Sequence, residues 1–110
     1  MILHNKLAKS DFYNCKYKNF GDFMVKLVAD LHHGKLAYDA EWHADLESEL
    51  LSDGSAQHDL WGFNYYPDKD TLEYNSLINI RPTENKSSDI LDPAICSRVE
   101  HVFRKWIQDE

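Results

Sequence analysis

Residues 23–41, FMVKLVADLHHGKLAYDAE, decide the fold. Apolar side chains alternate along residues 23–31 and again along residues 35–41, which predicts two strands. His33-Gly34 can form a two-residue turn between them, because glycine accepts a positive φ. Pairing across this turn places one set of apolar side chains on a common face: Val25, Leu27, Ala29, Leu36, Tyr38 and Ala40. The stretch therefore predicts an antiparallel β-hairpin.

A second hairpin is predicted from residues 59–66 and 71–81, joined by the sequence PDKD at residues 67–70. Proline and aspartate favour a turn there. One face of this hairpin is apolar and carries Trp61, Phe63, Tyr65, Leu72, Tyr74, Ile78 and Ile80, together with Ser76. The opposite face is mostly polar and carries Gly62, Asn64, Glu73, Asn75, Asn79 and Arg81.

Three segments outside the hairpins are predicted to be helical. Ser10-Asp11 can cap a short helix running to about Asn19, with Gly21 ending it. Residues 44–52 form a second helix that stops near Gly54 and buries Leu46, Leu50 and Leu51. Asp92-Pro93 supplies an N-cap and a first-turn proline for the last helix. Its apolar stripe is Ile95, Val99, Val102, Phe103 and Trp106.

The order of these elements is helix, hairpin, helix, hairpin, helix. This order predicts one α+β domain over residues 1–110, with a four-stranded, mainly antiparallel sheet and helices packed on one face. The other face of the sheet would be mixed in character and open. The pattern does not determine the strand order.

Composition excludes some classes of function. The net charge is −7, from 12 Lys and Arg against 19 Asp and Glu, and no basic block is present. Direct nucleic-acid binding is therefore disfavoured. No apolar run approaches a membrane span, and the N-terminus lacks the apolar stretch of a signal peptide, so we expect a cytoplasmic protein with no membrane partner. Cys15 and Cys96 match no zinc spacing, and Cys96 is expected to be a buried or half-buried thiol.

His43 is the first candidate for acid-base catalysis. If a helix begins there, Glu47 follows one turn later on the same face. The carboxylate would raise the pKa of the imidazole and the helix N-terminus would lower it, so we expect His43 to titrate near neutrality. In this interpretation Glu47 or Asp45 orients His43. The alternative is that Asp45 caps the helix, which places His43 outside it.

Asn79 and Arg81 are candidates for holding a ligand, because they share a strand face and a guanidinium can bind a carboxylate or phosphate with two parallel hydrogen bonds. The alternative is that Arg81 pairs with Asp39 or Glu41 across the sheet. His43, Asp45 and Glu47 also offer nitrogen and oxygen donors of the kind that bind metals. No motif with metal-ligand spacing accompanies them, so no metal ligand is assigned and the cofactor is unknown.

Several motifs occur in a fixed order along the chain: HADLE at residues 43–47, GSAQHDLWG at residues 54–62 and SLINIRP at residues 76–82. With them, the segment from Val25 to Ile107 resembles a family of small prokaryotic proteins, bacterial ones among them, catalogued as a domain of unknown function. The resemblance implies a shared fold and a shared polar surface. It adds weight to the candidates His43, Asp45, Glu47, Gln57, Asp59, Asn79 and Arg81. Trp42, beside His43, departs from the family pattern and can fill or cover a pocket there.

Two classes of function follow from these patterns. The first is binding of a small polar or anionic ligand at the polar cluster, with hydrolytic or transfer activity as an extension. In this class the catalytic candidates are His43, Glu47 and Asp45, and the ligand-binding candidates are Gln57, Asp59, Asn79 and Arg81. The second is an interaction module, either a homodimer or an acidic partner of a basic protein. It rests on the net charge and on apolar residues that interrupt the open sheet face: Met24, Val28, Leu60, Tyr66 and Leu77.

Overall fold

The computed structural model describes residues 1–17 and 23–108 of the chain. Four strands form one sheet in the order β2-β1-β3-β4, and every neighbouring pair is antiparallel. The strands are β1 (Val25–Asp30), β2 (Lys35–Tyr38), β3 (Leu60–Tyr66) and β4 (Thr71–Glu73). The predicted α+β class and the four-stranded antiparallel sheet are confirmed. The pairing of β1 with β3 supplies the strand order that the sequence left open.

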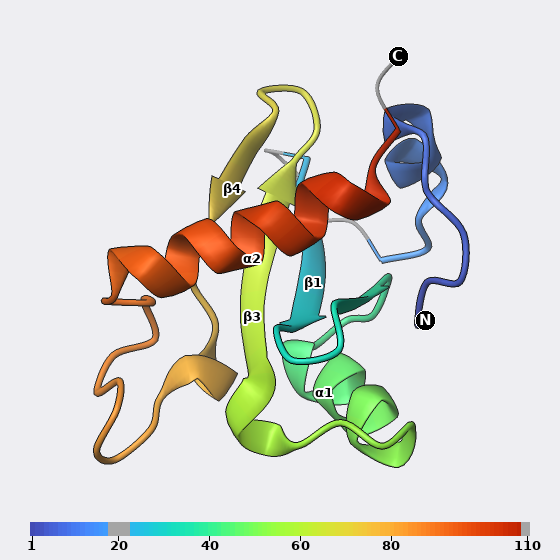
Figure 1. The fold of residues 1–110 in the computed structure, drawn as a ribbon. Helices are drawn as coiled ribbons and strands as arrows, with labels where there is room; N and C mark the ends of the chain where they lie inside the picture. Colours follow the sequence, from blue (N-terminus) through green and yellow to red (C-terminus); the bar gives the residue numbers. More distant parts are fainter. Residues whose placement is uncertain (18–22, 109–110) are drawn as a thin grey trace.

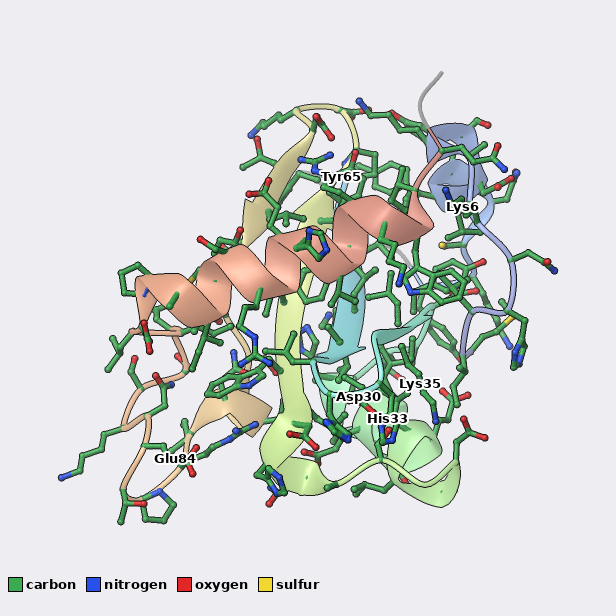
Figure 2. The ribbon with its side chains drawn as sticks, in the orientation of Figure 1. Lys6, Asp30, His33, Lys35, Tyr65 and Glu84 are labelled. Atoms are coloured by element: carbon green, nitrogen blue, oxygen red, sulfur yellow. The ribbon has the colours of Figure 1, made fainter. Side chains whose placement is uncertain are left out.

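The first hairpin places the predicted apolar residues on one face, with Leu27 opposite Tyr38 and Ala29 opposite Leu36. The prediction of a two-residue turn was wrong, because β1 ends at Asp30 and β2 begins at Lys35. The Asp30 carboxylate accepts hydrogen bonds from the N–H groups of His32 and His33, both at 2.9 Å. These bonds fold both histidines into the turn, and Figure 2 shows Asp30 and His33 together there.

β2 is shorter than predicted and ends at Tyr38. Asp39, which follows, has a φ of 68° and therefore cannot continue an extended strand.

The second hairpin turns at residues 67–70 as predicted, and Tyr65 pairs with Leu72. The predicted strand over residues 71–81 was wrong beyond Glu73, where the chain leaves the sheet and forms a short 3-10 helix, η3 (Leu77–Asn79). Ser76 begins this helix, and its Oγ accepts the N–H of Ile78 at 3.3 Å. A serine hydroxyl that bonds a backbone N–H two residues later competes with strand pairing.

The longest helix, α2 (Pro93–Trp106), covers one face of the sheet and crosses β3 and β1 in Figure 1. Asp92 caps it as predicted, accepting the N–H of Ala94 at 2.9 Å. Its buried residues, Val99, Val102 and Phe103, join the main core with Leu27, Leu36, Phe63 and Tyr65. Cys96 on this helix is half-buried, as expected. Among the described residues, no helix has the length and apolar character needed to cross a membrane.

The predicted helix near the N-terminus is present as a 3-10 helix, η1 (Lys9–Asn14), which buries Phe12. Its start is fixed by Asp11, whose carboxylate accepts the N–H of Ala8 at 2.8 Å. The predicted cap at Ser10-Asp11 was wrong, because Ala8 occupies the N-cap position, and the helix ends before Cys15, which is extended. The predicted residues 18–21 lie outside the described part of the chain.

The helix α1 (His43–Ser52) packs against the opposite face of the sheet. The prediction that all helices lie on one face was therefore wrong. Val28, Ala37 and Leu60 give the second face an apolar patch of their own, and Leu46 and Leu50 of α1 cover it. Leu51, which was also predicted to be buried, is 41% exposed. The helix stops at Gly54 as predicted, with a φ of 100°.

Candidate functional site

α1 begins at His43 without a side-chain cap. Trp42 occupies the N-cap position and makes no capping hydrogen bond. The first N–H groups of a helix have no partner inside the helix, and they carry the positive end of its dipole. Asp45 lies in the first turn and is exposed, so the alternative in which it caps the helix is wrong.

A cavity of about 280 Å³ opens at this helix start, and we call it the helix-start cavity. Its polar lining consists of Lys26, His43, Asn64, Asn75 and Ser76. Its apolar lining consists of Trp42, Ala44, Leu77 and Ile78. Among these, Trp42 is 60% exposed and Leu77 is 79% exposed, so the apolar part of the lining faces solvent.

His43 is held in place by β3. Its Nε2 lies 2.9 Å from the carbonyl oxygen of Phe63, which can only accept, so Nε2 carries the proton and Nδ1 keeps a lone pair when the ring is neutral. Burial lowers the pKa of His43, the Phe63 carbonyl opposes this, and the charge of Lys26 lowers it further. Glu47 is not among the groups that shift the pKa of His43. The expectation that this carboxylate raises the pKa of His43 and offsets the effect of the helix N-terminus was therefore wrong.

Asn64 presents an unsatisfied acceptor at the same cavity. The residue is 5% exposed, and its Nδ2 donates to Glu73 Oε1 at 2.8 Å and to the Asn75 carbonyl at 3.3 Å. These two acceptors fix which end of the amide is nitrogen. The Oδ1 atom is buried and has no hydrogen-bond partner within the described part of the chain. The Asn64 side chain lies close enough to the His43 ring to raise the pKa of His43.

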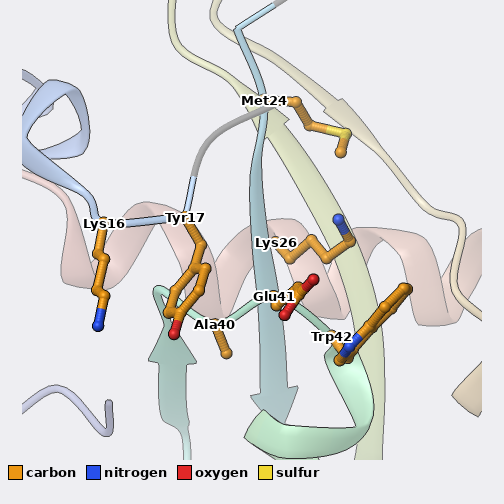
Figure 3. A pocket seen from close by; sticks show the side chains of 7 residues that line it. All are labelled: Lys16, Tyr17, Met24, Lys26, Ala40, Glu41 and Trp42. Atoms are coloured by element: carbon orange, nitrogen blue, oxygen red, sulfur yellow. The ribbon is translucent and has the colours of Figure 1, made fainter. Parts of the chain in front are cut away.

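Lys26 stands opposite Asn64 in the pairing of β1 with β3 and belongs to two cavities. The second cavity measures about 460 Å³ and shares Lys26 and Trp42 with the helix-start cavity. We call it the Tyr17 cavity; it is lined by Lys16, Tyr17, Met24, Lys26, Ala40, Glu41 and Trp42 (Figure 3). Lys26 forms no ion pair with any residue that the structure describes. Trp42 lines both the helix-start cavity and the Tyr17 cavity. The sequence indicated Trp42 as a residue that fills or covers a pocket beside His43.

Arg81 is buried and lies at the centre of a separate polar cluster. Its guanidinium donates to the backbone carbonyls of His58 at 2.8 Å and of Leu60, and it lies 3.7 Å from the centre of the Trp61 ring. Burial lowers the pKa of Arg81, and the charges of Glu84, Glu47 and Asp59 oppose this shift. The expected pairing of Arg81 with Asp39 or Glu41 across the sheet was wrong, because the side chain turns toward the loop before β3.

Glu47 belongs to the Arg81 cluster. Burial raises the pKa of Glu47, whereas Arg81 and Gln57 lower it. Its Oε2 atom is buried and has no hydrogen-bond partner among the described residues.

Asn79 is fully buried, and its side-chain amide pairs with the backbone of Gly62. Gly62 is required for this close approach, because a Cβ atom there would lie 2.6 Å from Cβ of Ser76. The atoms nearest to that Cβ position belong to the side chains of Ser76 and Ile78.

The structure thus divides the residues predicted from sequence. Glu47, Gln57 and Asp59 come together around the buried Arg81, with Gln57 exposed and the two carboxylates half-buried. His43 lies at the helix-start cavity, Asp45 is exposed and Asn79 is buried beneath Gly62. Their roles in ligand binding or catalysis remain predictions. Sequence reasoning missed Lys26 and Asn64, although both are polar residues within strands, because only the pairing of β1 with β3 brings them to one place.

The chain was compared with known proteins. No curated protein and no solved structure matches it. A family model described as "Protein of unknown function (DUF5674)" matches residues 1–106. This match confirms the resemblance to a family whose function is unknown. The chain belongs to the DUF5674 family.

Proposed function

We propose that this protein binds a small anion that also carries an O–H or N–H group, at the helix-start cavity. The observation that carries the proposal is the buried Oδ1 of Asn64, an acceptor without a partner in the described structure. A buried acceptor left unsatisfied costs about 1–3 kcal/mol, and a donor from a ligand removes that cost.

Two further features favour an anion. The first N–H groups of α1 have no side-chain cap, and helix N-termini with this property bind anions. Lys26 lines the same cavity and adds a positive charge that forms no ion pair with a described carboxylate. Negative charge on the ligand is therefore stabilised from two directions.

Hydrolytic or transfer activity, the extension predicted from sequence, would use His43 as the base. Its lowered pKa keeps the ring neutral at neutral pH, and the bond from Nε2–H to Phe63 leaves the lone pair of Nδ1 as the proton acceptor. The binding proposal does not depend on this extension.

The experiment is a thermal-shift titration with phosphate and with sulfate at constant ionic strength. Phosphate keeps an O–H group near neutral pH and sulfate does not, so phosphate is expected to raise the melting temperature more. At one hundred times its dissociation constant a ligand adds about 2.7 kcal/mol of stability. Lys26→Gln should abolish the shift, and Lys6→Gln, at an exposed lysine outside both cavities, is the matched control. Equal behaviour of Lys26→Gln and Lys6→Gln would overturn the proposal.

Association with a second copy of the chain is the second candidate function. It is favoured by the exposed apolar side chains of Trp42, Leu77 and Ile80, which are 60%, 79% and 49% exposed. Val28 and Leu60, which also motivated this interpretation, are covered by α1. Sedimentation across the micromolar range tests it: a concentration-dependent dimer that Leu77→Ser weakens supports association, and a strict monomer rejects it.

A further inference from the structure

We propose that the bound anion is one end of a longer ligand, a nucleoside monophosphate, whose ring and hydroxyl groups occupy the Tyr17 cavity. This inference rests on the proposed function, because it places the phosphate in the helix-start cavity. The two cavities share Lys26 and Trp42 and are therefore neighbours, as a single ligand with two ends requires. A volume of about 460 Å³ falls within the range of small-molecule sites.

Two aromatic side chains favour a planar ring in the Tyr17 cavity. Tyr17 is 39% exposed and Trp42 is 60% exposed, and Figure 3 shows their rings on either side of this cavity. The backbone of Tyr17 is anchored by its N–H group, which donates to Asp39 Oδ1 at 3.0 Å. A nucleobase stacked on an aromatic side chain gains about 1–3 kcal/mol.

The charges in the Tyr17 cavity favour one orientation of the ligand. Lys16 and Lys26 provide cations on a chain whose net charge is −7. Glu41 lines the same cavity, and its carboxylate accepts hydrogen bonds from hydroxyl or N–H groups but repels a second anion. The anionic end therefore belongs at the start of α1, and the end rich in donors belongs beside Glu41. A nucleoside monophosphate has this order of groups: phosphate, sugar hydroxyls and a base with N–H donors.

The Glu41 carboxylate should also distinguish a nucleotide from a simpler aryl phosphate by binding affinity. Phenyl phosphate offers the ring and the anion but has no hydroxyl or N–H group for Glu41. If Glu41 contributes, a nucleotide binds more tightly than phenyl phosphate, and Glu41→Gln removes part of that difference.

The test is calorimetric titration of the full chain with phosphate, phenyl phosphate, AMP, GMP, CMP and UMP. We expect at least one nucleotide to bind tenfold or more tightly than phosphate, and Trp42→Ala to bring its affinity back to that of phosphate. Leu91→Ala is the control, since Leu91 is 61% exposed and lines neither cavity. Circular dichroism checks that each variant is folded.

The outcomes separate the two proposals. If phosphate binds and no nucleotide binds more tightly, the nucleotide inference is overturned and the anion site stands. If phenyl phosphate matches every nucleotide, or Glu41→Gln leaves the difference unchanged, the nucleoside assignment is overturned. If neither phosphate nor any nucleotide binds in the millimolar range, both proposals fail.

Discussion

Asn79 pairs with Gly62 as a neighbouring strand would. The N–H of Gly62 donates to Asn79 Oδ1 at 2.8 Å, and Asn79 Nδ2 donates to the carbonyl of Gly62 at 2.9 Å. β4 ends at Glu73, so this part of β3 lacks a strand on that side. A single side-chain amide therefore satisfies the backbone of β3 where the chain has left the sheet. The absence of a Cβ atom at Gly62 leaves room for Ser76 beside it.

Asn79→Ala is expected to lower the free energy of unfolding by about 3 kcal/mol, because it leaves the buried N–H and carbonyl of Gly62 without partners. Urea denaturation followed by circular dichroism measures the change. Asn5→Ala, at an exposed position, is the control and should stay within about 0.5 kcal/mol of the parent. A loss for Asn79→Ala no larger than that of the control would contradict this role.

Gly62→Ala is expected to destabilise the fold by about 1–3 kcal/mol through overpacking against Ser76. The added Cβ atom would lie 2.6 Å from Cβ of Ser76 and 2.7 Å from its Oγ. A double-mutant cycle with Ser76→Gly isolates this contact, because the second change removes both atoms. The cost of Gly62→Ala should fall by roughly 1 kcal/mol or more in that background. An equal cost in both backgrounds would show that the close approach is unimportant.

Arg81→Lys tests whether Arg81 supports the fold or binds a ligand. Its guanidinium donates to the carbonyls of His58 and Leu60 and stacks on Trp61, which a lysine ammonium cannot reproduce. We expect a loss of about 1.5–3 kcal/mol in the free energy of unfolding, and an unchanged affinity of the folded protein for phosphate. A variant of normal stability that no longer binds phosphate would instead assign Arg81 to the ligand site.

Asp30 is expected to make stability depend on pH in the acidic range. Burial alone raises the pKa of Asp30, but hydrogen bonds from Ser55 Oγ and from His33 and His32 outweigh it, so the pKa is lowered. A carboxyl whose folded pKa lies below its unfolded value of about 3.9 stabilises the protein above that value, and this contribution is lost as the pH falls through the folded pKa.

Urea titrations between about pH 5 and pH 2.5 measure this effect of Asp30. The parent should lose more of its free energy of unfolding across that range than Asp30→Asn does. Parallel losses in the two proteins would mean that other carboxyl groups are responsible.

The parts of the fold that follow from sequence are those set by local alternation and capping. Residues 23–38 alternate so regularly that the apolar face shared by β1 and β2 could be predicted, and Asp92-Pro93 marked the start of α2. The second half of the predicted strand over residues 71–81 could not be recognised as irregular. Its departure depends on Asn79 bonding Gly62, a contact between residues distant in sequence. The placement of α1 on the second face likewise depends on Val28 and Leu60 meeting across β1 and β3.

The candidate site was predictable only in part, for the same reason. His43 stood out because of its residue type, and it does line the helix-start cavity. Lys26 and Asn64 reach that cavity only through the pairing of β1 with β3, which no local pattern indicates. Arg81 was prominent as a charged residue within an apolar stretch, yet its guanidinium donates to backbone carbonyls of His58, before β3, and of Leu60, at the start of β3. Burial of a charge marks a place where polar groups converge, but it does not separate a structural role from a functional one.

The central claim is that the start of α1 and Lys26 hold an anion. A titration of the ¹⁵N-labelled protein with phosphate, followed through the backbone amide signals, tests it most directly. The account predicts saturable shifts at the amides of His43 and Ala44 that Lys26→Gln removes and Lys6→Gln preserves. Amide signals of His43 and Ala44 that do not move in the millimolar range, or that move equally in Lys26→Gln, would contradict it.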